Sequence, residues 1–164
     1  MWLSAFFRGL AHNPAIIAAL ASIVIAQVIK VPIFFFSQRK WDFSKMFSTG
    51  GMPSSHSAAV CSLATVVGSE FGTGSTLFGA CVVFGVIVMY DAAGIRRHAG
   101  EQAIVLNQLE EEIGRYIDRH FSGNEMYQKK LKEMLGHQPI EVFMGAVLGI
   151  VLGVIAASVI HTTV

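Results

Sequence analysis

Two serines and a histidine stand at a point where the sequence predicts the start of a helix. A Gly-Gly turn and a proline are followed by Ser54, Ser55 and His56. A serine in this place caps a helix, and the N–H groups of the first turn favour an anion. We therefore expect a phosphate group to bind at Ser54 and Ser55, with His56 facing it. The alternative is an ordinary serine cap beside an incidental histidine.

A second histidine, His137, precedes a glutamate, Glu141, by four residues. Pro139 lies between them and suits the first turn of a helix, which would bring the carboxylate of Glu141 close to the imidazole of His137. A carboxylate in this place fixes the tautomer of the ring, and an oriented histidine can act as a nucleophile or base. The alternative is a surface histidine at the start of a helix.

Three basic residues and one acid complete the polar set. Lys30 lies within an apolar stretch, and Arg96 and Arg97 follow another. The planar guanidinium groups suit phosphate oxygens, although arginines also flank membrane segments as ordinary cytosolic charges. Asp91 could join Glu141 to bind a divalent cation such as Mg²⁺, which would indicate metal-assisted hydrolysis. The leading interpretation requires no cofactor.

Together these residues are suited to phosphoryl transfer from a phosphomonoester. One histidine would attack phosphorus, the cations would neutralise the phosphoryl oxygens, and the other histidine would protonate the leaving alcohol. For this chemistry, residues that are far apart in the sequence must meet at one place. The elements that carry them therefore decide whether a site exists.

The composition predicts that these elements are membrane helices. Of the 164 residues, 53% are hydrophobic and 14% are charged, whereas a soluble domain carries about 25% charged residues. The apolar residues cluster in four stretches, at about 14–36, 54–68, 76–93 and 139–160. A spanning helix needs roughly 20 apolar residues, so the second stretch is marginal and could be re-entrant. We expect an all-α, polytopic membrane helical bundle in one domain, residues 1–164.

The polar segment 95–136 is predicted to be a cytosolic insertion into this domain. Apolar residues recur there at helical spacing, which indicates an amphipathic helix: Leu106, Leu109, Ile113, Tyr116 and Ile117. A break at 122–124 would then separate it from a second short helix near 125–135. We expect the two helices to form a hairpin over the cytosolic mouth of the bundle.

The basic residues predict how the bundle is oriented. Loop 37–53 holds three of the twelve lysines and arginines, and loop 95–136 holds seven. Alternating crossings place both loops on one side, and the positive-inside rule makes that side cytosolic. We therefore expect both termini to lie outside the plasma (inner) membrane. The histidines and charges described above would then gather at the cytosolic face, and ionisable groups near a membrane core usually mark function.

Partners are suggested by small residues and by the charge. Gly145, Gly149 and Gly153 form repeated G-x-x-x-G pairs, which allow helices to approach closely. They could pack within the chain or form a homodimer contact, and we favour a dimer. The formal net charge of +1 does not indicate a nucleic-acid partner. The expected partners are the membrane, a lipid phosphate substrate and a second copy of the chain.

Four strings of the sequence resemble one membrane-protein family: GGMPSSHSA (50–58), MYDAAGIRRHAG (89–100), VLNQL (105–109) and GHQPIEVFMGAVLG (136–149). They look like the divergent PAP2 family, which is related to type 2 phosphatidic acid phosphatases and vanadium-dependent haloperoxidases. The resemblance implies that His56 is the general acid and His137 the nucleophile. It also implies that Glu141 replaces the usual orienting aspartate and that Lys30 binds phosphate.

The chain departs from the motifs of the wider superfamily at three places. Ser55 stands where glycine is usual, no Arg-Pro follows Lys30, and Leu131 stands where an arginine is usual before the second histidine. Arg96 or Arg97, from the end of the third apolar stretch, could supply the missing guanidinium.

By resemblance, the chain would be a lipid phosphatase at the cytosolic leaflet that acts through a phosphohistidine. Its substrate would be phosphatidylglycerophosphate, phosphatidic acid or a polyprenyl phosphate. Two alternatives stay open. One is a non-catalytic membrane protein that binds an anionic headgroup or a partner. The other is a small dimeric transporter, with Lys30 and Gln27 lining a path.

Overall fold

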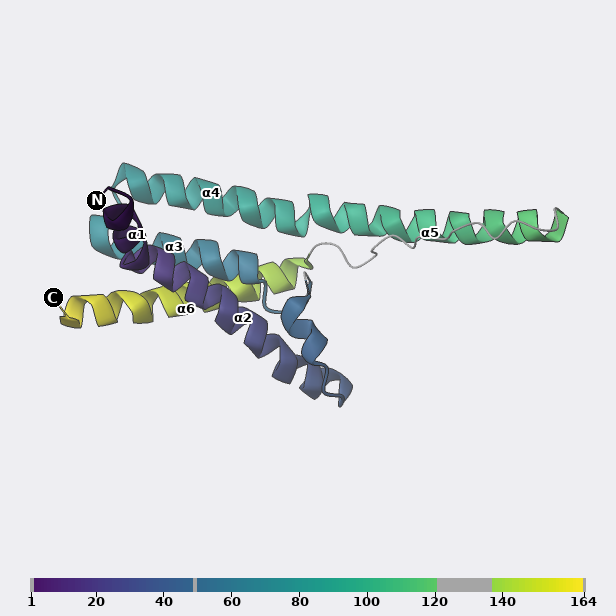
Figure 1. Ribbon diagram of the computed structural model, residues 1–164, viewed down its shortest axis with the longest axis horizontal. Helices are drawn as coiled ribbons and strands as arrows, with labels where there is room; N and C mark the ends of the chain where they lie inside the picture. Colours follow the sequence, from purple (N-terminus) through teal and green to yellow (C-terminus); the bar gives the residue numbers. More distant parts are fainter. Residues whose placement is uncertain (1, 49, 121–136, 164) are drawn as a thin grey trace.

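Helices form all the regular secondary structure of the described residues, which are 2–48, 50–120 and 137–163 of a computed structural model. Figure 1 shows a bundle with one long helical arm that extends from it. In chain order the elements are α1 (Trp2–Ala11), α2 (Pro14–Gln38), the short 3-10 helix η1 (Phe43–Phe47), α3 (Ser55–Phe71), α4 (Thr76–Ala93), α5 (Ile95–His120) and α6 (Pro139–Thr163). Helix α1 has no counterpart among the segments predicted from the sequence.

Three stretches of the described chain are long and apolar enough to cross a membrane: α2, the stretch Thr76–Tyr116 that begins with α4, and Pro139–Val159 of α6. Helix α3 has 17 residues and packs against α2, α4 and α6. Because it is surrounded by the other helices, α3 exposes little of its length to lipid. The predicted all-α membrane bundle is confirmed, and the marginal second stretch of the sequence is its central helix.

Small residues allow the helices to approach α3 closely. Ala26, Ala58, Ser22 and Ser62 are completely buried. The hydroxyl of Ser22 donates a hydrogen bond to the carbonyl of Ala18 in its own helix, at 2.8 Å, so its burial leaves no donor unsatisfied. In a membrane, where lipid tails are as apolar as leucine, such close packing supplies much of the association energy between helices.

The glycine stripe of α6 is part of this packing. A Cβ atom at Gly145 would meet the backbone of Ser54, and one at Gly153 would lie 2.6 Å from Cβ of Thr65. Of the two expectations for this stripe, the structure shows packing within the chain. The stripe is therefore covered by α3 and does not offer a homodimer contact, and a homodimer through another surface stays a prediction.

Gly149 gives the sharpest test of this packing, because a Cβ atom there would meet the carbonyl oxygen of Ala58 and lie 2.8 Å from its Cα atom. Gly149→Ala should therefore destabilise the protein by about 1–3 kcal/mol, although alanine is the better helix former. Gly79→Ala is the matched control, since a Cβ atom at Gly79 has no heavy atom within 4 Å. Thermal unfolding in detergent measures both variants, and equal Tm values would contradict the packing.

The helix ends that carry the polar residues meet at one end of the bundle. Figure 1 shows the end of α2, the start of α3, the end of α4 and the start of α6 on the same side, with α1 and the end of α6 at the opposite side. Local signals fix these ends. Asn13, Ser54 and Ser75 each cap the helix that follows, and Arg39 ends α2 in a left-handed conformation with φ of 56°.

Helix α5 differs from the expected position. It continues nearly along the direction of α4 and extends away from the bundle, instead of lying over the bundle's mouth (Figure 1). The reason lies at Gly94, whose N–H bonds to the carbonyl of Tyr90 and whose carbonyl accepts from His98. These bonds carry the helical pattern across the junction, so the chain does not turn. The expected break at 122–124 and the second short helix lie outside the described residues.

Candidate functional site

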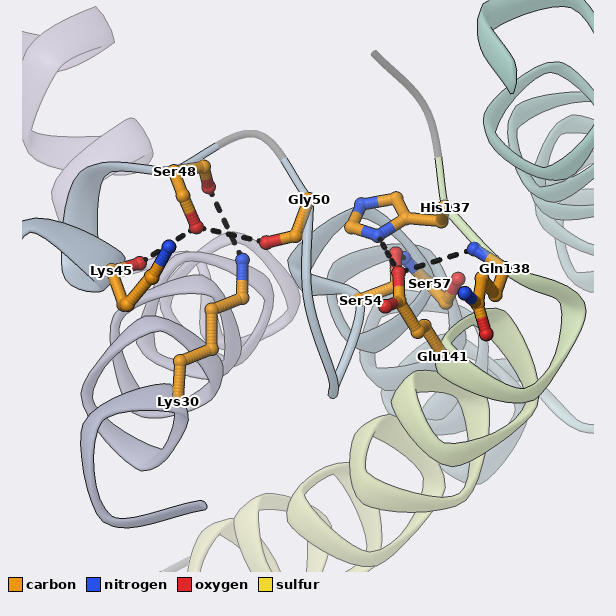
Figure 2. Close-up of polar contacts among 9 residues, drawn as sticks. All are labelled: Lys30, Lys45, Ser48, Gly50, Ser54, Ser57, His137, Gln138 and Glu141. Carbon is orange, nitrogen blue, oxygen red and sulfur yellow. Dashed lines mark hydrogen bonds and ion pairs between the residues drawn. The ribbon is translucent and has the colours of Figure 1, made fainter. Parts of the chain in front are cut away.

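The imidazole of His137 is buried at the start of α6 and held by a carboxylate. Its residue is 2% exposed, and its Nδ1 atom lies 3.0 Å from Oε2 of Glu141. The same oxygen accepts a hydrogen bond of 3.1 Å from the backbone N–H of Gln138 (Figure 2). Because the carboxylate accepts from Nδ1, that atom carries the proton in the neutral ring, and Nε2 is left with its lone pair. The predicted pairing of His137 and Glu141 is therefore present.

The other nitrogen of the His137 ring, Nε2, has a lone pair that no described residue shares. Within the described part of the chain, Nε2 of His137 is buried and has no hydrogen-bond partner. Buried polar atoms in proteins are nearly always paired, so an orphaned one needs an explanation. An oriented imidazole with a buried, unshared lone pair is the arrangement that a nucleophilic histidine requires.

His56 faces this ring from the first turn of α3. The ring centroids of His56 and His137 are 5.8 Å apart, and the ring planes are inclined at 68°. Ser54, which is fully buried, caps α3 because its hydroxyl accepts a hydrogen bond from the N–H of Ser57 at 3.4 Å. The predicted serine cap is thus observed, and it places His56 toward the other histidine. Direct binding of phosphate by Ser54 and its buried neighbour Ser55 stays a prediction.

Backbone hydrogen bonds lock the three helix ends together around the histidines. The N–H of Ser54 donates to the carbonyl of Glu141 at 2.9 Å, which joins the start of α3 to the start of α6. The N–H of His137 donates to the carbonyl of Ala92 at 2.9 Å, which joins the same region to the end of α4. The geometry of the histidine pair is therefore set by backbone contacts that a side-chain substitution leaves in place.

Lys30 brings a positive charge from α2. It is 3% exposed, and its ammonium donates a hydrogen bond of 3.3 Å to the carbonyl of Ser48 (Figure 2). Glu141 is near enough to attract it electrostatically, but among the described residues no carboxylate lies within the 4.0 Å of an ion pair. A buried ammonium at a membrane face, without an acid directly paired to it, is suited to bind an anionic ligand.

The arginines and Asp91 are less directly placed. Arg97 is exposed, and its guanidinium bonds to Glu101 of the same helix at 3.0 Å. The side chain of Arg96 lies outside the described part of the structure. Phosphate binding by Arg96 and Arg97 therefore stays a prediction, and so does the role of Asp91, which is half-buried on α4.

A divalent cation would need a cluster of ligands. Among the described residues, there is no group of three or more His, Cys, Asp or Glu side chains that could hold a metal ion. In addition, Oε2 of Glu141 is already engaged by His137 and Gln138. Metal-assisted hydrolysis stays a prediction, and the activity measured with and without a chelator tests it.

A second lysine near the site was missed in the sequence, where Lys45 served only to orient the protein. Lys45 lies in η1, and its ammonium is 4.9 Å from the ring centroid of Phe34 on α2. The capping residue Asp42, followed two positions later by Ser44, could have predicted the short helix. The contact with Phe34 could not have been predicted, because it depends on the turn between α2 and η1.

Comparisons with known proteins agree with this picture. A model of the divergent PAP2 family matches residues 11–152. The chain is 52% identical over 149 residues to the uncharacterised membrane protein YuiD of Bacillus subtilis (strain 168), a match that covers 88% of this chain and 94% of that protein. No solved structure matches the chain. The matched residues include both histidines, Glu141 and Lys30, and the chain belongs to the divergent PAP2 family.

Proposed function

We propose that this membrane protein is a lipid phosphatase that hydrolyses a phosphomonoester headgroup. The arrangement of His137 supports this proposal most strongly. Its Nδ1 atom is held by Glu141, its Nε2 atom is buried and unpartnered within the described chain, and its ring faces His56. Kinship with a family named after type 2 phosphatidic acid phosphatases points in the same direction.

The reaction would proceed in two steps. Nε2 of His137 attacks phosphorus, the P–O bond to the alcohol breaks, and His56 gives a proton to the leaving oxygen. A water molecule then attacks the phosphorus of the phosphohistidine. His56 accepts a proton from this water, the P–N bond breaks, and inorganic phosphate leaves. The first step leaves His56 without its proton and the second returns it, so the two steps together restore the starting protonation state.

Positive groups would stabilise the phosphoryl oxygens as charge develops on them. The ammonium of Lys30 is the first candidate, since it is buried and has no directly paired carboxylate in the described structure. The first turn of α3, with Ser54 and Ser55, adds the positive end of a helix dipole. Arg96 and Arg97 are further candidates, and binding of substrate would have to bring one of them to the phosphate.

Glu141 acts through His137, as a positioning residue. Glu141→Gln should lower kcat by roughly 10–1000-fold while KM changes little, because it disturbs the tautomer and charge of the imidazole but not the phosphate ligands. Steady-state kinetics on the purified variant measures this. Glu141→Asp is the matched comparison, since it keeps the charge and should recover part of the rate. A change in KM with kcat intact would assign Glu141 to substrate binding instead.

The substrate would be phosphatidylglycerophosphate, phosphatidic acid or a polyprenyl phosphate. Phosphate release by the purified protein, in detergent micelles containing each of these lipids, tests the proposal. Turnover that survives a chelator supports the histidine mechanism, and turnover lost to a chelator and restored by Mg²⁺ supports a metal-assisted reaction. No turnover on any of the lipids would favour a protein that binds an anionic headgroup without hydrolysing it.

The site is proposed to face the cytosol. The helix ends that form it lie at one end of the bundle. The basic residues of loops 37–53 and 95–136 support a cytosolic location for this end by the positive-inside rule. Inverted and right-side-out membrane vesicles compare the two faces when supplied with a short-chain, water-soluble substrate. Hydrolysis only in inverted vesicles is expected, and hydrolysis only in right-side-out vesicles would reverse the orientation.

A further inference from the structure

A pocket of about 310 Å³ lies between α2 and the loop that precedes α3. Its walls contain two lysines and several apolar or glycine residues, among them Lys30, Ile33, Phe34, Lys45, Gly51 and Met52. Gly51 lines the pocket, and its backbone amide is near enough to interact electrostatically with the carboxylate of Glu141 at the histidine site. Figure 2 shows Lys30 and Lys45 on one side of Gly50, with His137 and Glu141 on the other.

Hydrogen bonds of Ser48 hold the loop that forms one wall of this pocket. The hydroxyl of Ser48 lies 2.9 Å from the carbonyl oxygens of both Lys45 and Gly50, and the carbonyl of Ser48 accepts from Lys30. Gly51 has φ of 93°, a conformation that glycine adopts without steric cost. The ammonium of Lys30 is therefore held by the backbone of this loop.

Lys45 has little negative charge to neutralise it. Its ammonium is 3.8 Å from Oδ2 of Asp42, near the limit of an ion pair. The other carboxylate oxygen of Asp42 accepts from the N–H and the hydroxyl of Ser44, at 3.0 and 2.6 Å. The ammonium of Lys45 also lies over the face of Phe34, a contact that orients it without cancelling its charge.

The two lysines of the pocket differ in burial and in their partners. Lys30 is the buried lysine and the one that Glu141 attracts, so it belongs with the histidine pair. Lys45 lines the same pocket and is more accessible, with its side chain 28% exposed. Ile33 and Met52 also line the pocket, and such apolar walls suit the carbon linker of a lipid headgroup.

We propose that this pocket binds a second phosphate group of the same substrate molecule through Lys45, while Lys30 binds the phosphoryl group that is transferred. The inference rests on the proposed phosphatase function and narrows its substrates to lipids whose headgroup carries two phosphates. Two kinds of lipid have this chemistry. One is a lipid diphosphate, and the other is a phosphodiester lipid whose headgroup ends in a phosphomonoester, such as phosphatidylglycerophosphate.

Kinetics on Lys45→Gln tests the proposal. The purified variant is compared with wild type on phosphatidic acid, phosphatidylglycerophosphate and a polyprenyl diphosphate. We expect kcat/KM to fall by roughly 10–100-fold on one or both of the two-phosphate lipids, as for the loss of a charged hydrogen bond, and by less than about twofold on phosphatidic acid. The lipid that shows the loss identifies the source of the second phosphate. An equal loss on all three lipids, or no loss on any, would overturn the proposal.

Lys40→Gln is the matched control, because Lys40 is an exposed lysine of the same loop and does not line the pocket. It removes the same charge from the same membrane face, and it should leave all three kcat/KM values within about twofold. If Lys40→Gln reproduced the selective loss, the effect would belong to the general surface charge, and the pocket would have no specific role.

Binding of water-soluble probes separates this inference from the phosphatase function itself. The Tm of wild type is measured with inorganic phosphate, pyrophosphate and glycerol 1,3-bisphosphate. One of the two probes with two phosphates should raise Tm more than phosphate does, and Lys45→Gln should remove that difference while Lys40→Gln keeps it. If this pattern appears but no lipid is hydrolysed, the phosphatase function fails and the two-phosphate pocket stands. If neither probe exceeds phosphate, the pocket assignment is overturned even where hydrolysis is observed.

Discussion

Replacing His137 with alanine should abolish hydrolysis of every lipid phosphate that the wild-type protein turns over. No phosphohistidine can form at this position without Nε2, and the proposed mechanism gives the other side chains of the site binding or proton-transfer roles. A loss of at least about 1000-fold in kcat is expected, as for the removal of a catalytic nucleophile. Steady-state phosphate release in detergent micelles measures it.

The controls for His137→Ala separate chemistry from folding. The backbone hydrogen bond from His137 to Ala92 does not involve the side chain, so the start of α6 should keep its place, and Tm and elution volume should stay close to those of wild type. His98→Ala removes an exposed histidine of α5 that contacts Glu101 on the same helix, and it should keep full activity. Wild-type turnover by His137→Ala would show that another group is the nucleophile.

Replacing His56 with alanine should slow the reaction by an amount that depends on the leaving group. A general acid contributes roughly 100–10,000-fold where the leaving group is a poor one, such as the alcohol of a lipid phosphate. An activated phenol leaves with little protonation, so His56→Ala should slow the release of 4-nitrophenol from 4-nitrophenyl phosphate by less than about tenfold.

Single-turnover release of the alcohol or phenol is the proper measurement for His56→Ala, because it reports the first step alone. The second step also needs His56, as a base toward water, and would slow both substrates alike in the steady state. His137→Ala is the comparison, since it should block both substrates equally. If His56→Ala slowed the two first steps by the same factor, His56 would bind substrate or support the fold instead of donating the proton.

Local spacing made the core of the site predictable. Glu141 lies four positions after His137 across the start of a helix, which leaves the carboxylate few positions other than one beside the ring. The structure has the hydrogen bond between them at 3.0 Å. Ser54 was predictable as a cap for the same reason, since capping depends on the next three residues only. It was also predictable that these helix ends meet at one end of the bundle, because successive apolar stretches cross the membrane in opposite directions.

Features that depend on distant residues were not predictable. The polar segment 95–136 was expected to lie over the mouth of the bundle, yet the hydrogen bonds of Gly94 with Tyr90 and His98 carry the helical pattern from α4 into α5. The stripe of Gly145, Gly149 and Gly153 indicated close packing, but glycines do not specify which helix they contact. The side of α3 that covers them became known only with the three-dimensional arrangement.

The positions of the cationic side chains were predictable only where they depend on local sequence. Buried Lys30 was identified because a charge within an apolar stretch is unusual. Lys45 was not, because a lysine in a basic loop is expected on orientation grounds alone, and its approach to Phe34 depends on how η1 folds back on α2. Arg97 was assigned to phosphate from its type, although Glu101, four residues later on the same helix, is its partner in the structure.

Trapping of the phosphoenzyme is the most direct test of the proposed mechanism. The protein is mixed with a ³²P-labelled lipid phosphate, quenched with denaturant at alkaline pH and digested, and the labelled peptide is identified by mass spectrometry. We expect an acid-labile, alkali-stable label on His137 that is absent from His137→Ala. A label on another residue, such as Asp91, or hydrolysis without any covalent intermediate, would contradict a histidine nucleophile.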